Sequence, residues 1–195
     1  MFKFIMTDST DQIIDATQRW LERAVIGLNL CPFAKAVHVK HQIRYVVSVA
    51  TTTEAVLDDL ERELVFLRDA DPGLVDTTLL IAPQVFATFS EFADFLDLAE
   101  VVLRTHQLVG VIQIASFHPD YVFADAEVDD VTNCTNRSPY PTLHLLRETS
   151  LSRATQAYPD AAAIFERNIE TLNSLGSAGW KALNLGKNHQ TKDEI

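Results

Sequence analysis

The fold is decided by residues 43–82, which read IRYVVSVATTTEAVLDDLERELVFLRDADPGLVDTTLLIA. Ile43–Ala50 is rich in β-branched and aromatic residues, which predicts a strand. Thr52 or Thr53 then caps a helix that carries leucines along one face. After an Asp-Pro-Gly turn, Thr77–Ala82 predicts a second strand. A strand–helix–strand unit of this kind is typical of an α/β protein.

The alternation of helices and strands continues on both sides of this unit. A first helix starts near Ser9 or Thr10, with apolar residues at helical spacing. After the second strand, a helix capped by Ser90 leads to a third strand at Val109–Ala115. This order predicts a small, largely parallel sheet of about three or four strands covered by helices. The alternative is a ferredoxin-like antiparallel sheet with an extra strand near Tyr121–Ala124.

The last third of the chain is expected to be irregular and then helical. Residues 117–141 contain three prolines and several aromatic residues, which favour an ordered loop. A C-terminal helical segment follows, with helices at about Pro141–Ala157 and Asp160–Leu175. Gly176 is the stop signal of the second of these helices, and a short helical piece surrounds Trp180.

The composition bounds the class of protein. The chain has 195 residues, 47% hydrophobic and 22% charged, which suits one globular domain. We assign that domain to residues 1–183 and expect a flexible polar tail at 184–195. A formal net charge of −11 makes nucleic acid and anionic membranes poor partners. Only two cysteines are present, and no apolar run approaches the roughly 20 residues of a membrane span, so we expect a cytoplasmic protein.

Cys31 is the first candidate for chemistry. It lies in the loop Asn29–Pro32, which ends the first helix, and a short helix is expected from Phe33 to His38. Proline at the first helical position would place the thiol at a helix N-terminus, where backbone N–H groups lower the pKa of a cysteine. Cys31 is therefore a candidate nucleophile, and a buried structural thiol is the alternative.

Two histidines are candidates for proton transfer. His118 follows the third strand, at the edge where open α/β sheets bind ligands. The alternative is a histidine that caps the strand and bonds backbone. His144 is expected on a helix face that it shares with Glu148. A zinc site built from Cys31, His118 and His144 is conceivable, but the sequence has no closely spaced ligand pair such as C-x-x-C, so we assign no metal.

The richest polar segment is residues 129–141, which read DDVTNCTNRSPYP. Ser138 as N-cap of the next helix, with Arg137 beside the free N–H groups of its first turn, predicts an anion site. The predicted ligand-binding residues are Asn133, Asn136, Arg137, Ser138 and Arg147. The alternative is that Asn and Asp only build turns and that Arg137 pairs with Asp129 or Asp130.

Five motifs form a pattern that covers most of the chain. They are WLE at 20–22, VIGLNLCPFA at 25–34, QIASFHP at 113–119, TNRSPYP at 135–141 and LHLLRE at 143–148. This pattern resembles a bacterial family known only as a domain of unknown function, and the likeness runs from about Asp11 to Leu183. The resemblance implies a cytoplasmic single-domain protein and brings no activity with it.

Together these features predict a small-molecule enzyme that acts on a ligand bearing a phosphate or carboxylate group. Cys31 would be the nucleophile or redox thiol, and His118 and His144 would transfer protons. The alternatives are a non-enzymatic module that binds a metal or cofactor, and a protein-interaction domain that uses the loop from Pro119 to Pro141. The single-site hypothesis requires Cys31, His118, Arg137 and His144 to line one pocket. The sequence identifies no cofactor, substrate or oligomeric state.

Overall fold

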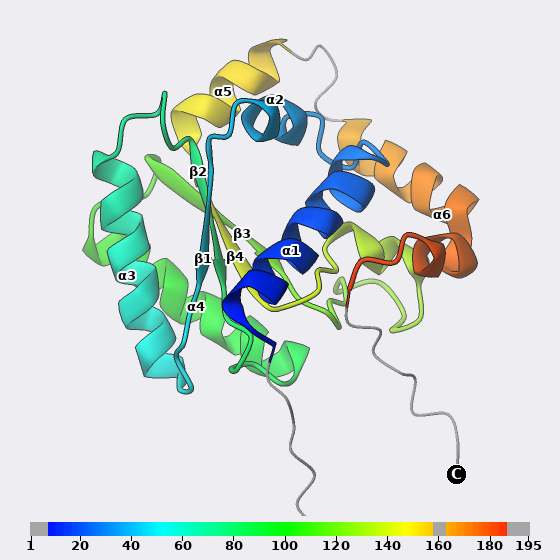
Figure 1. Cartoon of the computed structure of the whole chain (residues 1–195), viewed down its shortest axis with the longest axis horizontal. Helices are drawn as coiled ribbons and strands as arrows, with labels where there is room; N and C mark the ends of the chain where they lie inside the picture. Colours follow the sequence, from blue (N-terminus) through cyan, green and yellow to red (C-terminus); the bar gives the residue numbers. More distant parts are fainter. Residues whose placement is uncertain (1–7, 158–162, 187–195) are drawn as a thin grey trace, which may run out of the picture.

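The computed structural model describes residues 8–157 and 163–186, and a four-stranded sheet lies at its centre with helices on both faces (Figure 1). The strands are β1 (Ile43–Val47), β2 (Thr77–Ile81), β3 (Ile112–Phe117) and β4 (Thr142–Arg147). The helices are α1 (Thr10–Trp20), the π-helix η1 (Leu21–Ile26), α2 (Ala34–Val39), α3 (Thr53–Asp69), α4 (Phe89–Thr105), the 3₁₀-helix η2 (Val131–Thr135), α5 (Glu148–Ala157) and α6 (Ile164–Ala182). The predicted α/β class, with a small sheet and a C-terminal helical segment, is confirmed.

The sheet is more antiparallel than the sequence predicts. Its strand order is β1-β2-β4-β3. β1 and β2 pair in parallel, whereas β4 pairs antiparallel with both β2 and β3. The three predicted strands therefore run in one direction, but the prediction of a largely parallel sheet is wrong because β4 lies between two of them. The ferredoxin-like alternative is also wrong in placing a strand near 121–124, since the described residues 118–141 contain no strand.

β4 is the strand that the sequence analysis mistook for the start of a helix. Leu143 and Leu145 point into the core on one face, and His144 between them points to the other. Periodicity alone does not distinguish a short apolar strand from a buried helix. Residues 142–147 form a strand because they pair with β2 on one side and with β3 on the other. The helix predicted from Pro141 begins instead at Glu148.

Capping signals place most helix starts correctly. Ser9 caps α1 with a reciprocal bond pair involving Gln12, and Thr52 caps α3. The N-cap of α4 is Thr88 and not Ser90, which corrects the prediction. Thr88 is the cap because its hydroxyl accepts a hydrogen bond from the backbone N–H of Glu91, and the Glu91 carboxylate accepts one from the backbone N–H of Thr88.

The predicted C-terminal helices are largely present as α6. Gly176, predicted to end a helix, has a φ of 67° and marks a kink between the two halves of α6. Residues 160–162 of the predicted helix and 187–195 of the predicted tail lie outside the described residues. In the described part of the predicted tail, Leu185 packs against the cluster around Trp20.

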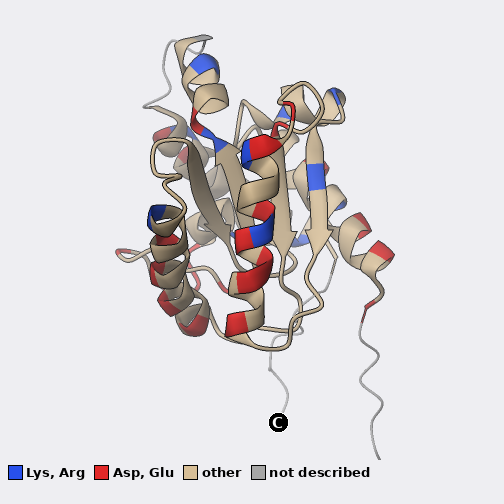
Figure 2. Ribbon diagram, turned by 90° about the vertical axis from the view of Figure 1, so that its left-hand side faces the viewer, with Lys and Arg blue, Asp and Glu red and all other residues tan. Residues whose placement is uncertain are grey.

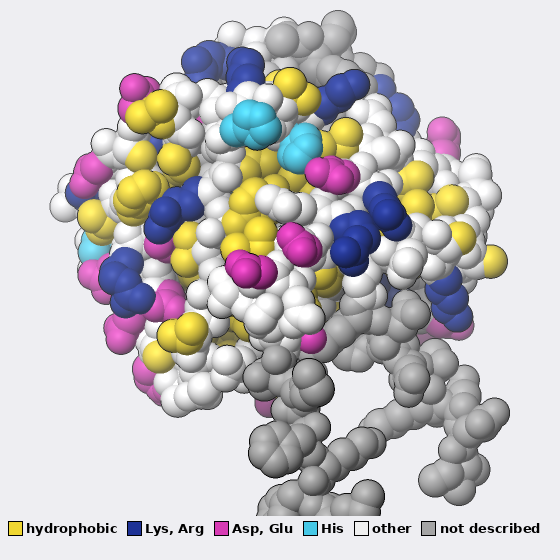
Figure 3. Space-filling model, in the orientation of Figure 1, with side chains coloured by type: hydrophobic (Ala, Val, Ile, Leu, Met, Phe, Trp, Pro, Cys, Tyr) yellow, Lys and Arg dark blue, Asp and Glu magenta, His cyan; other side chains and the backbone are white. Residues whose placement is uncertain are grey.

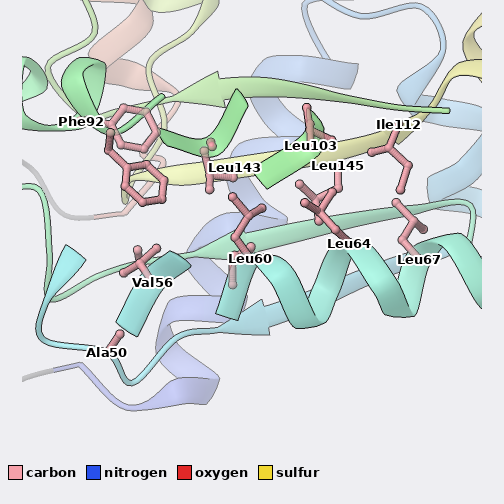
Figure 4. Close-up of a cluster of buried hydrophobic side chains, with 14 of the residues drawn as sticks. Ala50, Val56, Leu60, Leu64, Leu67, Phe92, Leu103, Ile112, Leu143 and Leu145 are labelled. Atoms are coloured by element: carbon pink, nitrogen blue, oxygen red, sulfur yellow. The ribbon is translucent and has the colours of Figure 1, made fainter. Parts of the chain in front are cut away.

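The main core lies between the sheet and the helices α3 and α4. Figure 4 shows leucines of α3 meeting those of β4, and Leu60, Leu64 and Leu145 are each 0% exposed. Fully burying one such side chain stabilises the fold by roughly 1.5–3 kcal/mol. The opposite face of the sheet packs against α1 and η1 through the cluster of Trp20, Leu21, Ala24, Val25 and Ala34, here called the Trp20 cluster.

The outward surfaces of the helices carry much of the acidic charge. In Figure 2, positions of Asp and Glu, coloured red, recur along the ribbons of the helices that face the viewer. In the described ranges, no helix combines the length and the apolar character that crossing a membrane requires.

Candidate functional site

The irregular segment after β3 is tied together by the residues predicted to bind a ligand. Asn133 is 0% exposed. Its Oδ1 accepts from the N–H of Phe123 at 3.0 Å, and its Nδ2 donates to the carbonyl of Glu127 at 2.7 Å. The Asn136 amide donates to the carbonyl of Ser116 at 3.1 Å. Both amides therefore fix the path of the loop.

Arg137 and Ser138 also bond the backbone. The Arg137 guanidinium donates to the carbonyls of Tyr121 and Val128, at 3.2 and 2.7 Å. The Ser138 hydroxyl donates to the carbonyl of Tyr140 at 2.7 Å. The next element after Ser138 is the strand β4 and not a helix, so the expected anion site at a helix N-terminus does not form there. Ligand binding by these four residues stays a prediction, and the geometry gives each of them a role in the loop.

Arg147 lies elsewhere, at the far end of β4. It is 8% exposed and donates to the carbonyls of Ala70 and Val75, at 2.7 and 3.2 Å. These bonds join β4 to the chain between α3 and β2. Its Nε is buried and finds no partner in the described structure.

Both ring nitrogens of His118 form hydrogen bonds with backbone groups. Its Nδ1 accepts from the N–H of Asp120 at 3.0 Å, so Nε2 carries the proton and donates to the carbonyl of Phe86, also at 3.0 Å. The side chain is 1% exposed and its ring lies 5.4 Å from that of Phe92 on the α4 side of the sheet. This arrangement matches the structural alternative for His118 more closely than proton transfer.

His144 is on the other face and keeps one ring nitrogen unused. The Thr77 hydroxyl donates to the carbonyl of Leu145 at 2.6 Å, so it must accept from Nε2 of His144 at 2.7 Å. Within the described ranges, no donor reaches Nδ1 of His144. Burial lowers the pKa of His144 to about 4, which keeps the imidazole neutral at neutral pH.

The sheet separates the two histidines. The His144 ring lies 6.3 Å from Phe117, which in turn packs edge-on against Trp20 at 5.1 Å. Cys31 packs against the same Trp20 cluster. Cys31 and His144 therefore share one side of the sheet, whereas His118 faces α4 and Arg137 lies in the loop after β3. The four residues do not surround one cavity.

Cys31 lies two residues before Phe33, the N-cap of the short helix α2, so the prediction of Pro32 at the first helical position is wrong. The environment of the thiol also differs from the expected one. Backbone N–H groups of Phe33 and Ala34 favour the thiolate. Burial outweighs them and raises the pKa of the Cys31 thiol. The expectation of a lowered pKa is therefore wrong, because the apolar Trp20 cluster removes water from the sulfur.

The pKa values also argue against Cys31 and His144 as a resting nucleophile–base pair. Moving a proton from a thiol above the ordinary value of about 8.5 to an imidazole near 4 is unfavourable by more than about 6 kcal/mol. An activated thiol normally has a base whose pKa is close to neutrality.

The reactivity of the two cysteines checks this assignment. At pH 7 we expect iodoacetamide to alkylate Cys31 more slowly than glutathione, because less of the thiol is ionised. Cys134 should be slower still, since it is 4% exposed and burial also raises its pKa. Mass spectrometry of the native protein over a range of pH, with Cys31→Ser to assign the signal, measures both rates. Fast alkylation of Cys31 with an inflection below pH 8 would restore it as a nucleophile.

Tyr45 is a polar residue that the sequence analysis missed. It lies on the edge strand β1, packs against the Trp20 cluster and has a buried hydroxyl without a partner among the described residues. Burial, and then the charge of Glu22, raise its pKa to about 12. All five residues of β1 are half-buried, and Figure 3 shows hydrophobic side chains gathered near the centre of this face of the molecule.

A cleft of about 180 Å³ lies between the turn that contains Cys31 and the first half of α6. Its walls are formed by Leu28, Asn29, Pro32, Ile164, Arg167, Asn168, Glu170 and Thr171. This volume is large enough to hold several water molecules or a small organic molecule. The cleft thus combines apolar walls with one cation, one carboxylate, two amides and a hydroxyl.

Asn168 links the two walls of the cleft. It is 6% exposed, and its Nδ2 donates to the carbonyl of Leu30 at 3.0 Å. Within residues 8–157 and 163–186, no donor reaches its Oδ1. The bond to the carbonyl of Leu30 fixes α6 against the turn that contains Cys31.

Comparison with known proteins gives a family but no activity. A family model described as "Protein of unknown function (DUF1415)" matches residues 12–182. No curated protein and no solved structure matches the chain. In the described part of the chain, no three His, Cys, Asp or Glu side chains are grouped as a metal ion would need.

Proposed function

The chain belongs to the DUF1415 family, whose function is unknown, and we propose from the geometry that it binds a small anionic molecule in the cleft beside α6. The observation that carries the proposal is the cleft itself, whose lining combines the apolar side chains of Leu28, Pro32 and Ile164 with polar groups that include Arg167. Small-molecule sites are concave and mostly apolar, with a few polar groups that orient the ligand.

The position of the cleft at the start of α6 supports an anionic ligand. Arg167 lies in the first turn of the helix, and the N-cap residue, Ala163, has no side chain that could bond the first N–H groups. The dipole of a helix favours negative charge at this end by roughly 0.3–1 kcal/mol. A guanidinium adds charge-assisted hydrogen bonds to a carboxylate or phosphate.

This proposal keeps the predicted class of ligand and moves its site. Arg137, the cation predicted from the sequence, lies in the loop after β3, and Arg167 is the cation that lines the cleft. The predicted reaction at Cys31 stays a prediction. A cytoplasmic location remains part of the proposal, because both Cys31 and Cys134 are free thiols.

Arg167→Gln tests the proposed site. We expect the variant to bind small anions at least about tenfold more weakly than the wild type, because a charge-assisted hydrogen bond contributes roughly 1.5–3 kcal/mol. Calorimetric titration with acetate, isovalerate and inorganic phosphate measures the change. Lys181→Gln is the control, since it removes one exposed positive charge from the same helix away from the cleft. Equal binding by both variants, or none by the wild type, would refute an anion site at Arg167.

A further inference from the structure

The outward side of the first helix carries charges that are separated by sign. Asp11, Asp15 and Arg19 follow one another at four-residue spacing on α1, and Arg23 comes four residues later in η1. Residues at this spacing lie on one side of a helix. Asp11, Asp15 and Arg23 are exposed, and Arg19 is half-buried. They form a stripe, here called the α1 stripe, that is acidic in its first half and basic in its second half.

The charges of the α1 stripe are not neutralised within the chain. None of the four side chains forms an ion pair in the part of the chain that the structure describes, although Asp15 and Arg19 have a suitable spacing. The Arg23 guanidinium donates to two backbone carbonyls that follow α6, and these carry no net charge. Asp11 neighbours Asp15, and Arg19 neighbours Arg23. Because like charges four residues apart destabilise a helix, the stripe is unfavourable in a single copy of the chain.

The helix dipole explains only the ends of this pattern. It favours an acidic side chain in the first turn of a helix and a basic one in the last turn, and its effect falls off beyond them. α1 continues directly into η1, so Asp15 and Arg19 lie in the middle of one continuous helix. The charges of these two residues therefore need another explanation.

We propose that the α1 stripe is the contact between two copies of this chain in a dimer with two-fold symmetry. A two-fold axis midway between Asp15 and Arg19 runs the two helices antiparallel, so the acidic half of each stripe meets the basic half of the other. Asp15 then pairs with Arg19 of the second copy, and Asp11 pairs with Arg23 of the second copy. The symmetry repeats each pair on the other side of the axis.

Apolar surface lies on the same face of the molecule. α1 lies toward the viewer in Figure 1, and Figure 3 shows hydrophobic side chains near the centre of this face with acidic and basic side chains beside them. β1 is an edge strand at this face, and its five residues are all half-buried. Glu22 of η1 is paired with His38 and is not part of the stripe. An apolar centre with charged groups beside it is typical of a protein–protein interface.

Analytical ultracentrifugation of the full chain tests the dimer. At micromolar concentration and low salt, we expect the wild type to sediment with twice the mass of the 21.8 kDa chain. Asp15→Arg brings arginines of the two copies together, so it should raise the dissociation constant at least about tenfold, and Arg19→Asp should do the same. The double variant Asp15→Arg, Arg19→Asp exchanges the charges and should restore the dissociation constant to within about threefold of the wild-type value.

Asp97→Arg is the matched control and should leave the dimer unchanged, because Asp97 is exposed on α4, which covers the opposite face of the sheet. Circular dichroism checks that each variant is folded, and Asp11→Arg repeats the test at the second predicted pair. A monomeric wild type would overturn the proposal, and so would single charge reversals without effect. Single reversals that the double variant fails to rescue would also overturn it, since the charges would then not meet across the axis.

Discussion

Replacing His118 with alanine is expected to lower the free energy of unfolding by about 3–5 kcal/mol. The change removes a ring that packs against Phe89 and Phe92 and leaves a cavity in the core. It also leaves the N–H of Asp120 and the buried carbonyl of Phe86 without their partner. The carbonyl of Phe86 belongs to a buried residue and adds roughly 1–3 kcal/mol, whereas Asp120 is exposed and its N–H can bond water.

Phe86 makes this effect larger. Its φ is 63°, a left-handed conformation that a bulky residue adopts only at an energetic cost of roughly 1–3 kcal/mol. The bond from His118 is one of the contacts that hold the loop before α4 in this conformation. Without it, we expect the loop around Phe86 to relax and its aromatic contacts with Phe92 and Phe95 to weaken.

Urea unfolding followed by circular dichroism measures the loss. His106→Ala is the control, because its side chain lies at the surface and pairs with the exposed Glu61, so a change within about 1 kcal/mol is expected. A His118→Ala protein as stable as the wild type would mean that the ring is not structural. The predicted proton-transfer role of His118 would then regain support.

The local elements of the fold were predictable because their signals are local. Ser9, Thr52 and the β-branched run of β1 each act within a few residues. β4 was not predicted because residues 142–147 form a strand only through pairing with β2 and β3, which are not adjacent to it in the sequence. The sequence TLHLLR, followed by good helix formers, is compatible with either state until those partners are known.

The polar loop shows for a related reason why polar residues alone do not identify a site. Asn, Asp, Ser and Arg gather where ligands bind, but they also gather where a long loop must satisfy its own backbone. Asn133 and Arg137 do the latter in this protein. The sequence cannot tell whether a side chain points inward to its own carbonyls or outward to a ligand.

The cleft beside α6 could not be predicted from the sequence. It forms because Asn168 bonds the carbonyl of Leu30, which is 138 positions away. The motif at residues 25–34 includes the turn that borders the cleft, but its cysteine and not its cleft side was the feature with a recognisable chemistry. Arg167 and Glu170 have the spacing of any solvated helix face, so only the packing of α6 against the turn gives them a shared cavity.

The turn itself depends on a π-helix that no sequence signal indicated. The sequence predicts one regular helix up to the loop that begins at Asn29. In η1, the N–H of Gly27 instead donates to the carbonyl of Glu22 at 3.0 Å, and the N–H of Leu30 to that of Val25 at 2.9 Å. Each of these hydrogen bonds joins residues five apart instead of four, so one more residue is accommodated in the helical turn. This sets the direction in which the chain leaves the helix toward Cys31. Such segments are frequent at functional sites.

Gly27→Ala is therefore expected to destabilise the protein by about 2–3 kcal/mol. A Cβ at this position would lie 2.4 Å from the carbonyl oxygen of Arg23, which is backbone and cannot rotate away. Relief requires a change in the winding of η1, which would shift the turn and weaken the proposed ligand binding in the cleft as well.

Gly73→Ala is the control, because its Cβ would meet only the side chain of Asp71, at 3.2 Å. Alanine has the higher helix propensity, by roughly 1 kcal/mol, so an ordinary helical site would gain stability from the same change. Urea unfolding of both variants decides between these outcomes, and a Gly27→Ala protein more stable than the wild type would show that the π-helix is not required for the turn.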